Sequence, residues 1–312
     1  MLDWLLNRSR ADRRGTASPD EEALFDEEFQ RRLEYLAIVS RRIFAGRTRA
    51  ERRSKKTGSG IEFADHRPYV PGDDFRYLDW NVYQRLGRLL LRLYEEEEDL
   101  SVYVLVDASR SMSFGHPPKI EYAKKLAASF AYIALANLDR VSVLSFADGM
   151  VGRLAPTRGK NRIFTVFDFL RQMQPGGETS LATSTRTFVA QNERRGVCIL
   201  LSDLYDPAGF EEGINALRYA KFEPYVLHLL DRDETHPPLH GDVLLVDDET
   251  GERREVTVTP RILARFEQAH RGWRQRIETF CRDKQVAYHP LETHIPFDQA
   301  VLNVLRRGEM IR

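Results

Sequence analysis

The stretch Val102-Tyr-Val-Leu-Val-Asp107-Ala-Ser109-Arg-Ser111 combines a strand pattern with the start of a polar loop. Residues 102–106 form a continuous apolar and β-branched run, which is typical of a parallel strand buried on both faces. The run ends on Asp107, and hydroxyl side chains alternate after it at Ser109 and Ser111. An acid and two hydroxyls therefore stand where a buried strand leaves its sheet.

The sequence after this strand alternates between strand and helix patterns. Strand patterns recur at residues 141–146, 197–202, 225–230 and 286–289, and helical spacing covers residues 119–138, 163–173, 181–192, 208–220, 260–284 and 297–306. This alternation predicts an α/β fold with a doubly wound, mostly parallel, Rossmann-like sheet. Residues 150–154 are expected to return as an antiparallel edge strand, and residues 242–258 to form a β-hairpin decorating the edge.

Two later positions are expected to join the Asp107 loop. Thr179 follows the turn sequence Pro175-Gly-Gly-Glu178, and Asp203 ends the apolar run at residues 197–202. Ligands of doubly wound sheets bind beyond the carboxyl ends of the strands, and hard cations take oxygen ligands. The sequence therefore predicts one site for Mg²⁺, or for Mn²⁺ or Ca²⁺, made by Asp107, Ser109, Ser111, Thr179 and Asp203.

The residue types of this site indicate binding chemistry. If hydroxyls make the direct contacts, the charge of the cation is poorly neutralised, and a carboxylate from a partner is the natural missing ligand. Without a metal, the same residues would form an Asx-turn and a helix N-cap.

Composition excludes several classes of function. The chain has 312 residues, enough for a large core, and its 47 basic residues balance its 47 acidic residues. No global field therefore draws it to nucleic acid or to an anionic membrane. Two cysteines give no disulfide framework. The N-terminal apolar stretch is too short for a signal peptide, and no stretch has the length of a membrane span, so we expect a cytoplasmic protein.

Three segments are expected along the chain. Residues 1–57 contain a helix, whose apolar stripe should pack on the protein's own body, and a basic run at residues 47–56 interpreted as a solvated linker. Residues 58–100 form a turn-rich, charged segment, and residues 101–312 form the α/β domain.

Alternating charges surround a turn signal in the middle segment. Pro71 and Gly72 fit the centre of a type II turn, because glycine supplies the positive φ. The charged residues around it are Arg67, Asp73, Asp74, Arg76, Asp79 and Arg85. The acids could act as catalytic acid and base, but each has an arginine nearby in sequence, which favours an ion-pair network that fixes a compact turn.

Both motif groups resemble known families. The Asp-x-Ser-x-Ser run, the later threonine and the strand-end aspartate resemble the metal-ion-dependent adhesion site of von Willebrand factor type A domains. The segment upstream closely resembles the signature of the bacterial domain of unknown function 58 family, at Arg67, Tyr69, Pro71, Gly72, Asp73, Asp74, Arg76, Asp79 and Trp80. The resemblance runs from about residue 58 to the C-terminus. It implies a MoxR-type AAA+ ATPase as partner, in a chaperone-like or metal-insertion role.

An enzymatic function is the alternative. The run Arg158-Gly-Lys-Asn161 lacks the upstream glycine and the hydroxyl residue of a phosphate loop, so ATP hydrolysis is not expected. A metal-dependent hydrolase would use the same cation to activate water, with His116 as base. We instead predict a non-enzymatic, metal-dependent protein-interaction module, with the hydrolase and a scaffold carrying a vestigial site as alternatives.

Overall fold

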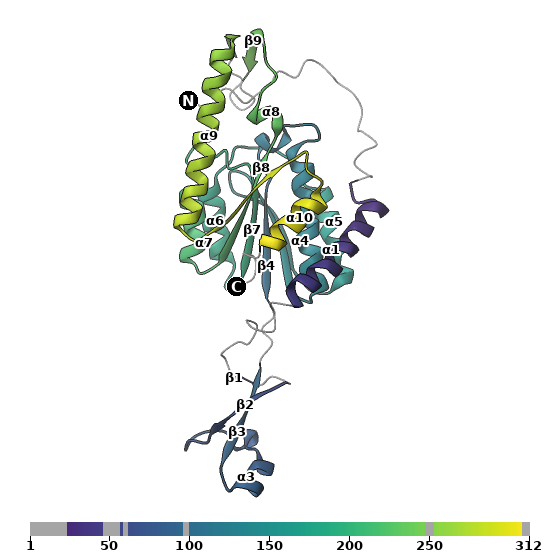
Figure 1. Cartoon of the computed structure of the whole chain (residues 1–312), viewed down its shortest axis with the longest axis vertical. Coiled ribbons are helices and arrows are strands. Elements are labelled where there is room, and N and C mark those ends of the chain that lie inside the picture. Colours follow the sequence, from purple (N-terminus) through teal and green to yellow (C-terminus); the bar gives the residue numbers. More distant parts are fainter. Residues whose placement is uncertain (1–23, 46–56, 59–61, 96–99, 247–252, 308–312) are drawn as a thin grey trace. The chain divides into compact units, whose positions relative to one another are not determined.

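The computed structural model describes residues 24–45, 57–58, 62–95, 100–246 and 253–307 (Figure 1). They fall into two compact units, described here one at a time. The sheet unit draws on Met1–Arg41 and Leu100–Ile311, and the signature unit on Arg42–Asp99. The basic run at residues 47–56 lies outside the described residues.

A six-stranded sheet forms the centre of the sheet unit. Its strand order is β11 (Ala287–Glu292), β8 (Glu223–Leu230), β7 (Val197–Ser202), β4 (Ser101–Asp107), β5 (Arg140–Phe146) and β6 (Met150–Thr157). The first five strands pair in parallel, and β6 pairs antiparallel with β5 at the edge. The predicted mostly parallel α/β sheet and its antiparallel edge strand are confirmed.

Helices cover both faces of this sheet (Figure 1). One face carries α4 (Lys119–Ala136), with α5 (Ile163–Arg171), α10 (Phe297–Arg307) and α1 (Glu27–Ala45) around it, and the other carries α6 (Leu181–Gln191), α7 (Glu211–Tyr219) and α9 (Pro260–Asp283). Every residue of β4 is buried. This double burial explains the continuous apolar sequence with which the strand was recognised.

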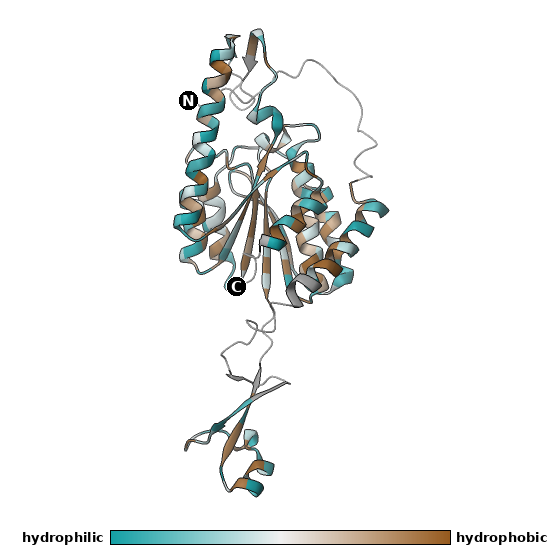
Figure 2. Cartoon of the chain, in the orientation of Figure 1, coloured by the Kyte–Doolittle hydropathy of each residue, from teal (hydrophilic) through white to brown (hydrophobic). Residues whose placement is uncertain are grey.

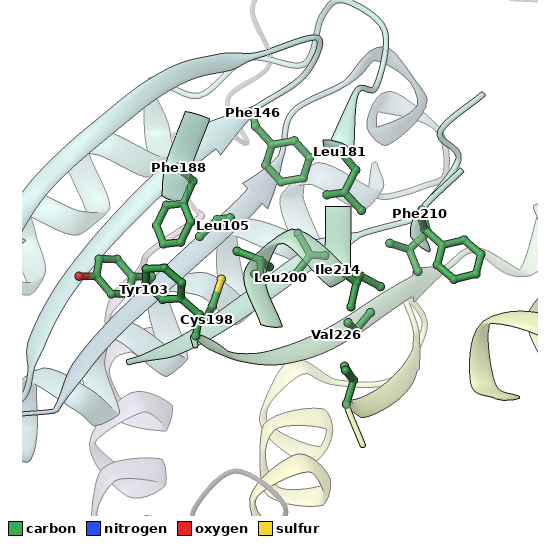
Figure 3. Packing of buried hydrophobic residues seen from close by; sticks show 14 of the residues in the cluster. Tyr103, Leu105, Phe146, Leu181, Phe188, Cys198, Leu200, Phe210, Ile214 and Val226 are labelled. Carbon is green, nitrogen blue, oxygen red and sulfur yellow. The ribbon is translucent and has the colours of Figure 1, made fainter. Parts of the chain in front are cut away.

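A large apolar cluster lies between the sheet and the α6, α7 and α9 layer. Tyr103 and Leu105 of β4 pack there with Phe188 of α6 and Ile214 of α7 (Figure 3). Apolar colour is concentrated on the central strands, whereas the outward turns of the helices are hydrophilic (Figure 2). Burial of this kind contributes about 25 cal/mol per Å² of apolar surface, and it holds the carboxyl ends of β4 and β7 in fixed positions.

The N-terminal helix α1, as far as Arg41, belongs to the sheet unit. The ring of Phe25, just before the helix, stacks on Phe167 with centroids 4.5 Å apart, and Phe29 contacts Phe297 at 4.8 Å. The predicted packing of this apolar stripe on the protein's own body is confirmed.

Smaller elements complete the sheet unit. The 3-10 helices η3 (Arg110–Ser113) and η4 (Lys160–Arg162) and the short helix α8 (Arg232–Thr235) occupy connections. The expected hairpin is present as β9 (Gly241–Val246) and β10 (Arg253–Val258), but it forms a separate two-stranded sheet and does not extend the edge of the main one. Its turn, residues 247–252, lies outside the described residues.

The signature unit has its own three-stranded antiparallel sheet. The strand order is β1 (Thr57–Gly58), β3 (Leu90–Glu95) and β2 (Glu62–Pro68). The 3-10 helix η2 (Phe75–Tyr77) and helix α3 (Trp80–Leu86) connect β2 to β3. In the described parts of both units, no helix combines the length and the apolar character needed to cross a membrane.

Candidate metal centre

Asp107 and Ser202 meet where β4 and β7 end side by side. Parallel pairing sets Val106 opposite Leu201, so the next residue of each strand reaches the same edge. The Ser202 hydroxyl donates to Asp107 Oδ2 at 2.5 Å, and the Ser109 backbone N–H donates to Asp107 Oδ1 at 2.9 Å. The carboxylate of Asp107 is fully buried and is fixed from both sides.

The hydroxyls after β4 extend this arrangement to Asp203. The oxygens Ser109 Oγ and Ser111 Oγ lie 3.0 Å apart, and the Ser111 side chain also hydrogen bonds to the Asp203 carboxylate. The structure therefore connects Asp107 to Asp203 through the two serines and brings these four predicted site residues together.

Thr179 reaches the same edge through the turn before α6. The Gly176 N–H donates to the Ala108 carbonyl at 2.8 Å, and the Arg110 N–H donates to the Gly177 carbonyl at 3.0 Å. These two bonds hold the turn against the Asp107 loop. Thr179 follows Gly177 by two residues and is 6% exposed. The five predicted site residues thus come from segments that converge at the carboxyl ends of β4 and β7.

The backbone after Asp203 is strained in a way that serves the site. Leu204 has φ of 59°, in the left-handed region that a leucine rarely adopts. In this conformation the Leu204 N–H donates to Ser202 Oγ at 2.9 Å, and the Tyr205 N–H donates to Asp203 Oδ1 at 3.1 Å. Strain of this kind costs about 1–3 kcal/mol and collects at functional sites. Here it orients groups beside both site acids.

Lys119, the first residue of α4, is a site residue that sequence reasoning missed. Its ammonium is fully buried, 2.7 Å from Asp203 Oδ2 and 2.5 Å from Glu234 Oε1. The ring of Tyr205 lies beside it, with the centroid 5.1 Å from Nζ. A lysine at the start of a helix is an ordinary sequence feature, so only the folded chain reveals this contact.

The buried charges of the site are unbalanced. Three carboxylates, on Asp107, Asp203 and Glu234, are buried with one ammonium, that of Lys119, which contacts Asp203 and Glu234 but not Asp107. Burial, together with the Asp203 charge, raises the pKa of Asp107 to about 7, and burial also raises the pKa of Glu234 to about 7. Burial alone would raise the pKa of Asp203 as well, but the adjacent Lys119 lowers it. With every group ionised, these three acids and one lysine have two negative charges in excess, and the buried carboxylate of Asp231 beside Glu234 adds one more, so the surroundings favour a cation.

The oxygens of the site also fit a small divalent cation. Neighbouring ligands of an octahedral Mg²⁺ ion lie about 3.0 Å apart, because each is about 2.1 Å from the metal. The 3.0 Å between Ser109 Oγ and Ser111 Oγ matches this spacing, and it is equally a hydrogen-bond distance when no cation is bound. Among the described residues, no group of three or more His, Cys, Asp and Glu side chains could hold a metal. The candidate centre contains two acids, Asp107 and Asp203, and three hydroxyl residues, Ser109, Ser111 and Thr179.

The charged residues of the signature unit pair with one another. Arg67 binds Asp73 through two bonds of 2.6 and 2.7 Å, and Arg76 Nη2 lies 2.6 Å from Asp74 Oδ2. Gly72, at φ of 108°, occupies the turn between them. The expected ion-pair network around a compact turn is confirmed, and it accounts for these two acids structurally.

The third acid pairs with an arginine outside the predicted set. Asp79 accepts 2.9 Å bonds from Arg92 and from His66, and its other oxygen caps α3 through the backbone N–H of Asn81 and Val82. The Arg92 and His66 bonds hold the pKa of Asp79 well below its usual range. Arg85, which the sequence placed in the network, is exposed on α3. The strand β3 supplies the arginine because it pairs with β2 across the unit.

The other signature side chains shape this unit. Tyr69 stacks on Phe75 with ring centroids 5.5 Å apart, and Trp80 begins α3 with 56% of its surface exposed.

In the sheet unit, His116, the base required by the hydrolase alternative, is an exposed loop residue between η3 and α4.

Comparisons with known proteins identify the family. The family model described as protein of unknown function DUF58 matches residues 65–276. This chain belongs to the DUF58 family. The matched residues run from the DUF58 signature in β2 to the C-terminal half of α9, so they include every residue of the candidate metal centre.

Relatives and solved structures were also found. Uncharacterized proteins of Mycobacterium bovis and Mycobacterium tuberculosis are 28% identical to this DUF58 protein over 223 residues, which cover 69% of this chain and 70% of theirs. The conserved hypothetical protein BatB from Bacteroides thetaiotaomicron is similar with a TM-score of 0.43, at 14% identity over 68% of this chain and 98% of its own. The manganese-loaded TRAP protein of Plasmodium vivax has a TM-score of 0.35, at 20% identity over 42% of this chain and 57% of its own.

Proposed function

We propose that this DUF58 protein is a non-enzymatic interaction module that binds a carboxylate of a partner protein through a divalent cation. The observation that carries the proposal is the paired hydroxyls of Ser109 and Ser111, 3.0 Å apart beside the fully buried Asp107. Neutral oxygens next to an uncompensated acid attract a cation while leaving much of its charge unneutralised. Mg²⁺ is the cation that we propose, with Mn²⁺ and Ca²⁺ as substitutes.

Each residue of the centre has a separate task in this proposal. Ser109, Ser111 and Thr179 would offer hydroxyl oxygens to the cation, and Asp107 would supply the negative charge closest to them. Asp203, bonded to Ser111, orients that hydroxyl. The bound cation would supply a Lewis-acidic position that accepts a carboxylate oxygen. The family resemblance favours a MoxR-type AAA+ ATPase as the owner of that carboxylate.

A binding role agrees with the groups around the centre better than catalysis does. Hydrolysis needs a base within reach of a water molecule, and the buried lysine is held between two carboxylates while His116 is exposed in its loop. A metal-dependent hydrolase would be supported by turnover of phosphate or peptide substrates that is lost in Asp203→Ala.

Capture of the partner tests the proposal. Purified MoxR-type ATPase from the same organism should be retained by the immobilised wild-type protein with Mg²⁺ and released by a chelator. Ser109→Ala should lose this capture, because one oxygen at the cation is removed. Ser113→Ala is the matched control: its hydroxyl lies in the same η3 segment but donates to the Arg110 carbonyl at 2.7 Å. If the amount of captured ATPase changes neither on addition of the chelator nor in Ser109→Ala, the mechanism is rejected.

A further inference from the structure

The Asp203 carboxylate already accepts hydrogen bonds from three described residues, one of them charged. Lys119 donates to Oδ2 at 2.7 Å, the Tyr205 N–H donates to Oδ1 at 3.1 Å, and the Ser111 side chain bonds to the same group. The donors to Asp107 in the described chain are all neutral, from Ser109 and Ser202. Asp107 and Asp203 look equivalent in the sequence, but only Asp203 has a positively charged side chain bonded to it.

Lys119 is fixed at this position from its far side as well. Its second partner, Glu234, belongs to the capping box of α8, where Glu234 Oε2 accepts from the Asp231 N–H at 3.4 Å. Both partners are buried, with Asp203 0% and Glu234 3% exposed. A buried ammonium with two buried carboxylates has no alternative solvation, so the contact is persistent. Moving Lys119 away from Asp203 would leave this buried negative charge with neutral donors only.

We propose that Lys119 is a built-in cation that holds Asp203 as its own counter-ion, and so determines both the metal affinity and the carboxylate preference of the centre. This inference rests on the proposed function. With Asp203 retained by Lys119, a divalent ion at Ser109 and Ser111 meets one uncompensated acid of this chain, Asp107. The ion is then bound weakly and keeps the positive charge that an acidic partner recognises.

Replacement of the lysine should change the two kinds of binding in opposite directions. In Lys119→Met, Asp203 becomes available to the cation, so calorimetry should show Mn²⁺ binding on the order of tenfold tighter or more. The cation is then better neutralised. Fluoroacetate, a simple carboxylate probe followed by ¹⁹F NMR on the Mg²⁺-loaded protein, should therefore bind more weakly than to wild type. An unchanged or tighter fluoroacetate affinity overturns the inference.

A second variant keeps the test decisive if Lys119→Met does not fold. In Glu234→Gln, Lys119 pairs with Asp203 alone, so Mn²⁺ should bind several-fold more weakly than to wild type. Asp231→Asn is the matched control, because the Asp231 carboxylate is a neighbouring buried acid that accepts from Thr293 at 2.8 Å. A general charge effect would weaken both variants equally, and that result overturns the inference.

The two proposals fail in different ways. The metal centre and this inference are rejected together if wild type, Lys119→Met and Glu234→Gln all fail to bind Mn²⁺ while circular dichroism shows that they are folded. In another outcome, wild type binds Mn²⁺, Ser109→Ala loses this binding, and Lys119→Met binds with unaltered affinity. That result retains the metal centre and rejects only the role of Lys119.

Discussion

Replacing Asp107 by asparagine should stabilise the metal-free protein at pH 8, because the site contains an uncompensated buried charge. Burial and the nearby Asp203 charge raise the pKa of Asp107 from 3.8 to about 7. Each pKa unit corresponds to 1.36 kcal/mol, so ionised Asp107 disfavours folding by about 4 kcal/mol. Asparagine has nearly the same shape and no charge.

The net gain is smaller than this cost. Asp107 accepts from the Ser202 hydroxyl and from the Ser109 N–H, and an amide can accept at only one of its two ends. A lost hydrogen bond at a buried site costs about 1–3 kcal/mol. Asp107→Asn should therefore raise the free energy of unfolding by about 2 kcal/mol at pH 8.

Urea unfolding of both proteins in a chelator measures the difference. At pH 5 the gain should disappear, because wild-type Asp107 is then protonated and neutral as well. With saturating Mn²⁺ the order should reverse, since only wild type gains stability from the cation. A destabilised Asp107→Asn protein at pH 8 without metal would refute the electrostatic account of this site.

Three further predictions follow from the described contacts. The folded-state pKa of Asp107 and of Glu234 is raised to about 7, so the contribution of these groups to stability falls as the pH rises from about 4 towards 7. The protein in a chelator should therefore show a lower Tm at pH 7.5 than at pH 5.5. A Tm that rises across this interval would contradict the prediction. Leu200→Ala, at a fully buried position of β7, should lower the free energy of unfolding by about 2–5 kcal/mol in urea, whereas a loss below about 1 kcal/mol would show that this layer is loosely packed. Asp79→Ala removes the α3 cap and the partner of Arg92; amide exchange of Asn81 and Val82 should accelerate, and unchanged exchange rates would refute the capping role.

Local sequence patterns predicted most of the sheet unit. The continuous apolar run of β4 and the helical spacing of α4 are properties of neighbouring residues, so they can be recognised without knowledge of the fold. The convergence of Asp107 and Asp203 also followed from the rule that parallel strands end at one edge of the sheet.

Contacts between distant segments could not be predicted in the same way. Lys119 and Glu234 are separated by 115 positions, and no local signal pairs them. The Leu181 N–H at the start of α6 shows the same limit: the Ser180 side chain before the helix makes no capping bond, and the distant Asp206 accepts from Leu181 at 2.7 Å. Asp79 likewise binds Arg92 of a paired strand and not the nearer Arg85.

Anomalous diffraction from crystals grown with millimolar Mn²⁺ tests the metal centre most directly. The account predicts one strong Mn²⁺ peak bonded to Ser109 Oγ and Ser111 Oγ at about 2.2 Å, beside Asp107 and with Asp203 still bonded to Lys119. A crystal without density at this position, or with Mn²⁺ bound only elsewhere on the protein, would contradict it.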